Sequence, residues 1–213
     1  MSAGFFLVLE GPEAAGKSTL ARALVQRFEA QGEPPLLVRE PGGTPVAEAL
    51  RKELLDAERN FAPEMELLYM TTARADLVAR VIRPALAAGR VVISDRYDLS
   101  TLAYQGAGRG LPPEQVRWVN RAATGGLLPD LTLVLDVDPA LARARQVSAG
   151  KGLDRMEREP ADFHARVAAA YRQASGPGIH HIAADSSMDQ VLDAAWPVVV
   201  KARAATVTSS GVR

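Results

Sequence analysis

A short apolar run, FFLVLE (5–10), is followed directly by GPEAAGKS (11–18) and then by a segment with helical periodicity. The run is typical of a buried strand, and Leu20, Leu24 and Phe28 fall on one stripe of the following segment, 17–31. A strand, a loop of the form G-x-x-x-x-G-K-S and a helix, in this order, are the context of a phosphate-binding loop. The glycines let backbone N–H groups turn inward, and the helix N-terminus adds positive potential.

This loop predicts a site for the phosphates of ATP. Lys17 is expected to bridge the β- and γ-phosphates, and the Ser18 hydroxyl is expected to ligate Mg²⁺. Asp95 follows the apolar run 91–94, so it emerges where ligands bind in α/β sheets, and we assign it to the metal. An ordinary turn aspartate is the alternative. The predicted ATP-binding residues are Gly11, Pro12, Glu13, Ala14, Ala15, Gly16, Lys17, Ser18 and Thr19.

Short apolar runs alternate with helical segments along the rest of the chain, which predicts a parallel sheet flanked by helices. The predicted strands are 5–9, 35–38, 91–94, 131–135 and 180–184. The predicted helices are 17–31, 64–88 with a break or kink at Pro84, 113–123, 138–148 and 187–204, and residues 206–213 are expected to be frayed. No linker or repeat divides the chain, so we predict one α/β domain over 1–213.

The composition favours a small charged ligand over nucleic acid. The 25 basic and 25 acidic residues cancel, whereas a nucleic-acid binder usually has a basic excess. The chain has no cysteine, no basic segment before its first apolar run, and no run near the roughly 20 apolar residues of a membrane span. We therefore expect a soluble, cytoplasmic protein that works without a membrane.

Several strings narrow the class of phosphate-loop protein. The guanine-reading NKxD and the DxxG of GTPase switches do not occur. The strings that do occur resemble those of bacterial thymidylate kinases, in order and over essentially the whole chain. They are EGPEAAGKST (10–19), REPGGT (39–44), LYMTTARAD (68–76), DRYDLSTLAYQ (95–105) and DRMERE (154–159).

The resemblance implies a three-layer P-loop nucleoside monophosphate kinase fold and transfer of phosphate from ATP to dTMP. It implies that Glu13 accepts a hydrogen bond from the sugar 3′-hydroxyl, and that Arg51 and Arg96 hold the acceptor phosphate, with Arg39 as a further candidate. Where the family usually has an aromatic ring against thymine, this chain has Met70, beside Tyr69. The residues that match the family's dTMP-binding positions are Glu13, Arg51, Met70, Arg74, Arg96, Thr101, Tyr104 and Gln105.

The segment 146–160, QVSAGKGLDRMEREP, is expected to be a lid that closes over the phosphates. A solvated surface loop is the alternative. Some family members carry an arginine inside the phosphate loop, where this chain has Ala14, so a lid arginine must supply that charge. The lid carries Arg143, Arg145, Lys151, Arg155 and Arg158, of which we favour Arg145 and Arg155; with Lys17 and Arg96 they form the predicted catalytic set.

Two further expectations come from the family. The peptide between Glu40 and Pro41 is expected to be cis, and the chain is expected to form a homodimer through helices within 44–88 and 113–124. Two rival functions remain open. One is a kinase for another nucleoside or nucleotide, and the other is a phosphate-loop switch that hydrolyses ATP without an acceptor.

Overall fold

The structure, a computed structural model, describes residues 4–148 and 154–210. Its centre is a five-stranded sheet in the order β2-β3-β1-β4-β5, and every neighbouring pair is parallel. The predicted parallel sheet is confirmed, and the ends of its strands lie within one residue of the expected positions. The strands are β1 (Phe5–Glu10), β2 (Leu36–Arg39), β3 (Val91–Asp95), β4 (Leu131–Asp136) and β5 (Ile179–Ala183).

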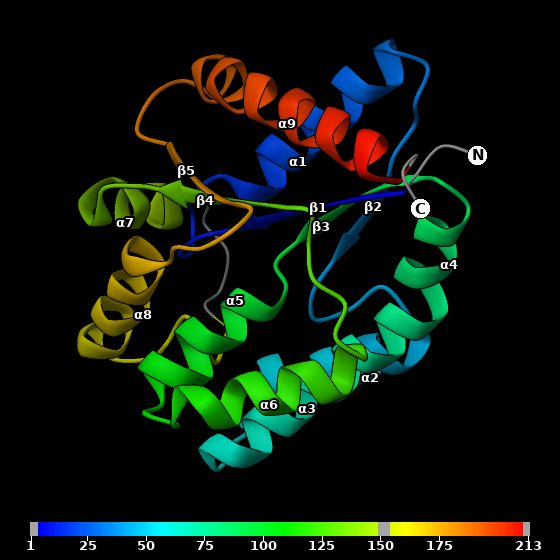
Figure 1. Cartoon of the computed structure of the whole chain (residues 1–213). Helices are drawn as coiled ribbons and strands as arrows, with labels where there is room; N and C mark the ends of the chain where they lie inside the picture. The colour runs from blue at the N-terminus through cyan, green and yellow to red at the C-terminus, as the bar shows by residue number, and fades with distance from the viewer. Residues whose placement is uncertain (1–3, 149–153, 211–213) are drawn as a thin grey trace.

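Helices cover both faces of the sheet, so the strands are apolar on both sides. Phe5, Leu7 and Leu9 of β1 pack in the core against α1 (Lys17–Ala30) and α9 (Met188–Ser210). The alternate residues Phe6 and Val8 belong to the core on the opposite face. Figure 1 shows α1 and α9 over one face, and the helices α2, α3 and α6 beyond the other. The remaining helices are α2 (Pro45–Leu55), α3 (Pro63–Leu77), α4 (Arg83–Ala87), α5 (Asp98–Thr101), α6 (Pro113–Thr124), α7 (Pro139–Ser148) and α8 (Ala161–Gln173).

The predicted helix 64–88 is interrupted earlier than expected. A π-helical segment, η1 (Val78–Ile82), joins α3 to α4, and Pro84 lies in the first turn of α4. Proline lacks an N–H, and its ring would crowd the carbonyl of Arg80 in a regular α-helix. The wider π turn relieves this clash just before the proline, so the chain deforms at 78–82 and not at Pro84 itself. A second π-helical segment, η2 (Leu102–Gly108), follows α5.

The C-terminal helix is longer than the sequence indicates. Helix α9 continues to Ser210, so the segment expected to fray from residue 206 is helical as far as the structure describes it. Thr206 and Thr208 donate their hydroxyls to the carbonyls of Ala202 and Ala204. These i−4 bonds satisfy the threonine hydroxyls within the helix. Among residues 4–148 and 154–210, no helix has the combined length and apolarity of a transmembrane span.

The strand register brings together the carboxyl ends of three strands, each of which carries a charged residue. Leu9 of β1 and Arg39 of β2 both lie opposite Asp95 of β3. Glu10, Arg39 and Asp95 therefore reach the same carboxyl edge of the sheet. The chain leaves β1 in one direction along the sheet and later adds β4 on its other side, and ligands bind at such a switch point in α/β sheets.

Candidate active site

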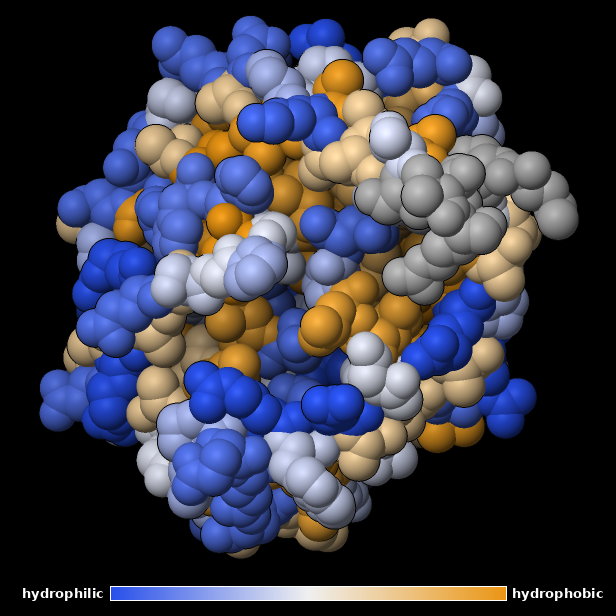
Figure 2. Space-filling view, viewed as in Figure 1, coloured by the Kyte–Doolittle hydropathy of each residue, from blue (hydrophilic) through white to orange (hydrophobic). Residues whose placement is uncertain are grey.

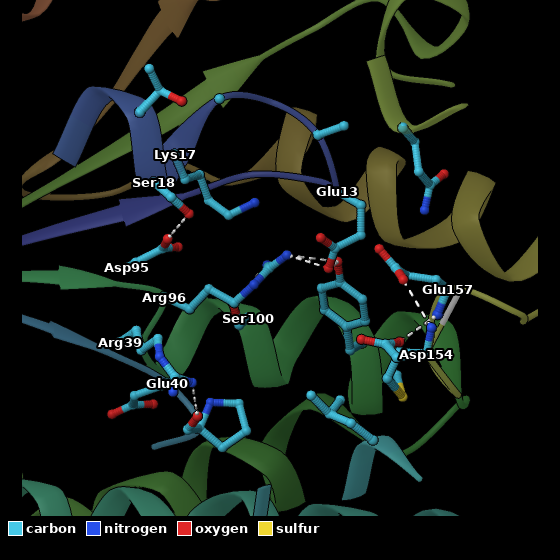
Figure 3. A pocket seen from close by; sticks show the side chains of 18 of the residues that line it. Glu13, Lys17, Ser18, Arg39, Glu40, Asp95, Arg96, Ser100, Asp154 and Glu157 are labelled. Atoms are coloured by element: carbon cyan, nitrogen blue, oxygen red, sulfur yellow. Dashed lines mark hydrogen bonds and ion pairs between the residues drawn. The ribbon is translucent and has the colours of Figure 1, made fainter. Parts of the chain in front are cut away.

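A cavity of about 720 Å³ lies at this carboxyl edge of the sheet. Figure 2 shows the molecule hollowed near the middle of the face seen in Figure 1, and Figure 3 shows charged side chains pointing into the pocket from several elements. Most of the predicted site residues meet here. Those that line the cavity are Glu13, Ala14, Gly16, Lys17, Ser18, Thr19, Arg51, Met70, Asp95, Arg96, Tyr104 and Arg145.

The phosphate-binding loop has the backbone that such a loop requires. Gly11, Ala14 and Gly16 all have positive φ, at 138°, 56° and 96°. A Cβ on Gly11 would lie 2.8 Å from the carbonyl oxygen of Leu135, so only glycine fits there. The Lys17 ammonium lies across the loop and donates to the carbonyls of Gly11 and Pro12, at 3.0 and 2.6 Å. The loop is thus folded around the lysine that is predicted to bind phosphate.

Lys17 is a buried cation. Its residue is 6% exposed, and burial together with the nearby Arg96 charge lowers the pKa of Lys17 to about 8, against the opposing effect of Glu13. A phosphate beside the ammonium would favour the charged form and raise this pKa again. Proton uptake by Lys17 is therefore coupled to phosphate binding above about pH 8.

Ser18 and Asp95 fit a magnesium site. The Ser18 hydroxyl donates to the Asp95 carboxylate at 2.5 Å, so an alcohol oxygen and a carboxylate oxygen already lie together at the start of α1. Mg²⁺ prefers hard oxygen ligands and is usually held by one or two protein groups plus water and substrate phosphate. Within the described residues no group of three or more acidic, His or Cys side chains converges on one point.

Glu13, the unexpected carboxylate of the phosphate-binding loop, faces Arg96 (Figure 3). Its Oε1 is 2.5 Å from an Arg96 guanidinium nitrogen and accepts a hydrogen bond from the Tyr104 hydroxyl at 3.0 Å. Burial in the cavity acts to raise the pKa of Glu13, but the charges of Arg96 and Lys17 outweigh it and lower the pKa to about 2. Glu13 is therefore an anion under all ordinary conditions, turned toward Arg96 and Tyr104.

Arg96 is held in a strained backbone conformation at the end of β3. Its φ is 75°, which costs a residue with a side chain about 1–3 kcal/mol. The Arg96 N–H donates to Leu9 at 2.9 Å, and its carbonyl accepts from the Ser94 hydroxyl at 2.7 Å. Its guanidinium also lies over the Tyr104 ring, 5.1 Å from the centroid. The strain aims the cation into the cavity between the phosphate loop and α5.

Three further side chains, those of Glu10, Ser100 and Tyr171, form a hydrogen-bonded cluster next to Arg96, and the sequence did not indicate them. The Tyr171 hydroxyl of α8 and the Ser100 hydroxyl lie 3.1 and 3.3 Å from one guanidinium nitrogen. The Glu10 carboxylate is fully buried, and it accepts hydrogen bonds from Ser100 and Tyr171 at 2.6 and 3.0 Å. The position of Glu10, at the polar end of an apolar strand, is the one sequence signal that could have identified this cluster.

The predicted cis peptide between Glu40 and Pro41 is confirmed. It lies beside Arg51, whose guanidinium donates to the Pro41 carbonyl at 2.8 Å. Arg51 is half-buried, and burial, together with the charge of Arg39, lowers its pKa. One guanidinium nitrogen of Arg39, Nη2, donates to both carboxylate oxygens of Glu48, at 3.0 and 3.1 Å. Arg39, Arg51 and Arg96 all line the cavity, and Arg39 is paired with Glu48.

Arg74 and the polar residues predicted to contact the base lie deeper than the main cavity. The Arg74 guanidinium is buried and binds Glu40 at 2.6 Å and Thr101 at 2.7 Å. It borders a second cavity, of about 10 Å³, which shares Met70 with the main one. Burial raises the pKa of Glu40 to about 7, although Arg74 opposes this. Tyr69 packs against Phe61, so Met70 is the one of the pair that faces the cavity.

The two favoured lid arginines lie in different surroundings. Arg145 lines the cavity and donates to the Ala184 carbonyl at 3.1 Å. Arg155 is buried elsewhere, where it pairs with Glu66 at 2.7 Å, and the structure does not bring it into the cavity. Gln105 likewise donates to Glu66, at 2.7 Å. Residues 149–153 of the predicted lid, including Lys151, lie outside the described residues.

The fold and the site together define a P-loop nucleotide phosphotransferase, in which a phosphate-binding loop and two arginines, Arg51 and Arg96, line one cavity. The sequence profile of the family described as thymidylate kinase matches residues 9–195. A thymidylate kinase of Cereibacter sphaeroides is 50% identical over 186 residues, which cover 84% of this chain and 86% of the relative. A thymidylate kinase of Pseudomonas entomophila is 43% identical over 210 residues, which cover 98% and 96%. The chain belongs to the thymidylate kinase family.

A phosphate contact of Lys17, as the sequence predicts, would make nucleotide binding depend on pH, because the pKa of Lys17 is lowered. We expect the Kd for Mg-ATP to be constant below about pH 8 and to rise about tenfold per pH unit above it, because the neutral amine must first take up a proton. Isothermal titration calorimetry between pH 7 and pH 9 measures this. Lys17→Arg is the matched control, since a guanidinium does not titrate in this range. A wild-type Kd that stays level up to pH 9 would contradict the assignment of Lys17.

Proposed function

We propose that this chain transfers the γ-phosphoryl group of ATP to dTMP, yielding ADP and dTDP. One observation carries the proposal beyond membership of the family. Two cationic groups are directed into a single cavity, Lys17 in the phosphate-binding loop and the pair Arg51 and Arg96 near the acceptor side. Hydrolysis of ATP needs no site for a second phosphate, whereas a monophosphate acceptor needs cations of its own.

In this mechanism the chain positions two anions and stabilises the charge that moves between them. An acceptor phosphate oxygen attacks the γ-phosphorus, the bond to the β,γ-bridging oxygen breaks, and that oxygen leaves with the electron pair on ADP. Lys17 binds the β- and γ-phosphates, and Arg96 and Arg51 hold the acceptor dianion through charge-assisted hydrogen bonds. No side chain forms a covalent bond, so positioning and charge account for the catalysis.

Glu13 and Tyr104 are proposed to recognise the sugar of the acceptor. Glu13 remains ionised beside Arg96, so it can accept a hydrogen bond from the 3′-hydroxyl while the arginine turns to the phosphate. The Tyr104 ring lies against the same guanidinium, where it would crowd a 2′-hydroxyl. For the base we propose Met70, whose polarizable sulfur can lie against thymine, and Arg74 below it, with Thr101 and Gln105 completing the surroundings.

Ser18 and Asp95 are the residues proposed to hold Mg²⁺. When bound, the ion would neutralise charge on the β- and γ-phosphates. For the lid we propose the segment 146–160. Just before it, Arg145 of α7 is the arginine proposed to reach the transferring phosphate, because it already lines the cavity. Closure of this segment would exclude water, which could otherwise accept the phosphoryl group.

A panel of acceptors tests the proposed function. ADP release in the presence of Mg-ATP should rise at least about a hundredfold with dTMP, because the acceptor supplies the nucleophile, and should rise much less with UMP, AMP or thymidine. A coupled assay for ADP measures this, with dUMP included to report on the thymine methyl group. ADP release that does not change with any monophosphate would favour the ATP-hydrolysing switch. A preference for UMP or thymidine would favour another nucleotide or nucleoside kinase.

Arg51 offers a test of the acceptor end that leaves the phosphate-binding loop intact. Arg51→Ala should raise the KM for dTMP about 10- to 100-fold, because a charge-assisted contact to the phosphate is lost, and should leave the KM for ATP within about twofold. Steady-state kinetics with each substrate varied in turn measure both values. Lys52→Ala, at the exposed neighbouring position on the same helix, is the control. Equal losses for both substrates would remove Arg51 from the acceptor site.

We also propose that the chain forms a homodimer through the layer of α2, α3 and α6. Large apolar side chains are exposed on these helices, with Val46, Met65, Leu68 and Trp118 exposed to 47, 44, 52 and 72%. Contiguous exposed apolar surface marks interaction sites. Trp118→Glu should shift the protein from dimer to monomer in sedimentation velocity at micromolar concentration. Val200→Glu, on α9 of the opposite layer, is the control, and a wild-type protein that sediments as a monomer would refute the proposal.

A further inference from the structure

Arg155 belongs to the predicted lid, yet its guanidinium is turned away from the cavity and into the protein. It is 8% exposed, it lies 2.7 Å from the carboxylate of Glu66, and its Nε donates to the Leu54 carbonyl at 2.7 Å. Its backbone N–H also donates to Leu55, at 3.3 Å. The guanidinium lies over the Phe61 ring, 5.1 Å from the centroid. The side chain therefore ties the segment that carries it to α2 and α3.

Glu66 collects a second arginine from another element. The Arg109 guanidinium, just after η2, contacts the Glu66 carboxylate at 2.9 Å and Glu159 at 2.6 Å. Glu66 is fully buried, and Gln105 of η2 donates to it as well. One buried carboxylate on α3 thus holds residue 155 directly and residue 159 through Arg109. The segment Asp154–Glu159 is fixed near both of its ends by the same group.

The residues on either side of Arg155 face the cavity. Asp154, Met156 and Glu157 line it, while Arg155 points the other way. Asp154 and Glu157 are linked by two backbone-to-carboxylate hydrogen bonds of 2.9 Å, which Figure 3 shows beside the Glu13 side chain. Like charges repel more strongly the closer they lie, so the position of these two carboxylates relative to a bound anion matters for the acceptor.

We propose that Glu66 is a positioning residue for phosphoryl transfer, which anchors Arg155 and Arg109 so that Asp154 and Glu157 take their places at the acceptor side of the cavity. The inference rests on the proposed function, because it assigns Glu66 a role in that reaction. It also gives Arg155 a structural partner in place of the phosphates. Two carboxylates, Glu66 and Glu159, balance the two guanidiniums, so the anchor is neutral as a whole.

The direct test is Glu66→Gln, which keeps the shape of the side chain and removes its charge. We expect kcat/KM for dTMP to fall about 10- to 100-fold, as displacement of a positioned group by about 1 Å does, with the KM for ATP unchanged within about twofold. Glu64→Gln, exposed on the same helix, is the matched control and should behave as wild type. Unchanged dTMP kinetics in folded Glu66→Gln would overturn the proposal.

A second control distinguishes a specific effect of Glu66→Gln on the kinetics from a general loss of protein stability. Phe28→Leu weakens the core on the far face of the sheet, so it should lower Tm without changing the kinetics per folded molecule. If Glu66→Gln does not fold, the double variant Glu66→Gln/Arg155→Met replaces it, because it leaves one fewer guanidinium unpaired. Both substitutions break the same ion pair, so their effects should not add. The kcat/KM of the double variant for dTMP should equal or exceed that of the less active single variant.

The same variants separate an anchoring arginine from one that touches the phosphates. If Arg155 stabilised the transferring phosphate, Arg155→Met would lower kcat about 10³- to 10⁵-fold, and Glu66→Gln, which frees the guanidinium, would not. That outcome would overturn the inference while leaving the proposed function intact. Absence of dTMP-dependent activity in the wild-type protein would instead refute the proposed function itself.

Discussion

The ion pair between Glu13 and Arg96 is the interaction on which the rest of the site depends. It joins the phosphate-binding loop, which follows β1, to the end of β3, and these two strands are neighbours in the sheet. Arg96 keeps an unfavourable φ of 75° because hydrogen bonds to Leu9 and Ser94 hold its backbone there. The carboxylate inside the loop therefore does not oppose phosphate binding. It pairs with the cation that faces the other substrate.

Charge within the cavity is divided between cations that are held in different ways. Lys17 is buried, donates hydrogen bonds to loop carbonyls and has a pKa lowered to about 8. A bound phosphate would favour its protonated, positively charged form. Arg96 already has an anion, Glu13, which lies on the side from which the acceptor is proposed to bind. A guanidinium cannot be deprotonated under ordinary conditions, so it remains a fixed cation whichever group it contacts. This division suits a reaction in which two nucleotides meet through their phosphates.

The sequence predicted those parts of the fold that depend on local pattern. The five parallel strands, the phosphate-binding loop and the cis peptide at Pro41 were all indicated by short strings, and all are present. The π-helical turns were not predicted, because a π turn has no periodicity of its own and the deformation at Val78–Ile82 answers to a proline further along the chain. Helix α9 exceeds its predicted length, and the hydroxyls of its polar threonines are satisfied by carbonyls of the same helix.

Among the site residues, those whose position is set by the strand ends and the loop were predictable, while those set by packing between distant segments were not. Asp95 ends β3 and Arg96 follows it directly, so their place at the sheet edge follows from the register. Arg155 carries the same charge as Arg145, and only the buried Glu66, which lies far away in the sequence, directs it elsewhere. Tyr171 reaches Arg96 from α8, and no local string indicates that contact. A crystal structure with dTMP and a non-hydrolysable ATP analogue tests the central claim most directly. The account predicts the dTMP phosphate on the guanidiniums of Arg96 and Arg51, with the Glu13 carboxylate on the 3′-hydroxyl, and it would be contradicted by a dTMP phosphate that touches neither arginine.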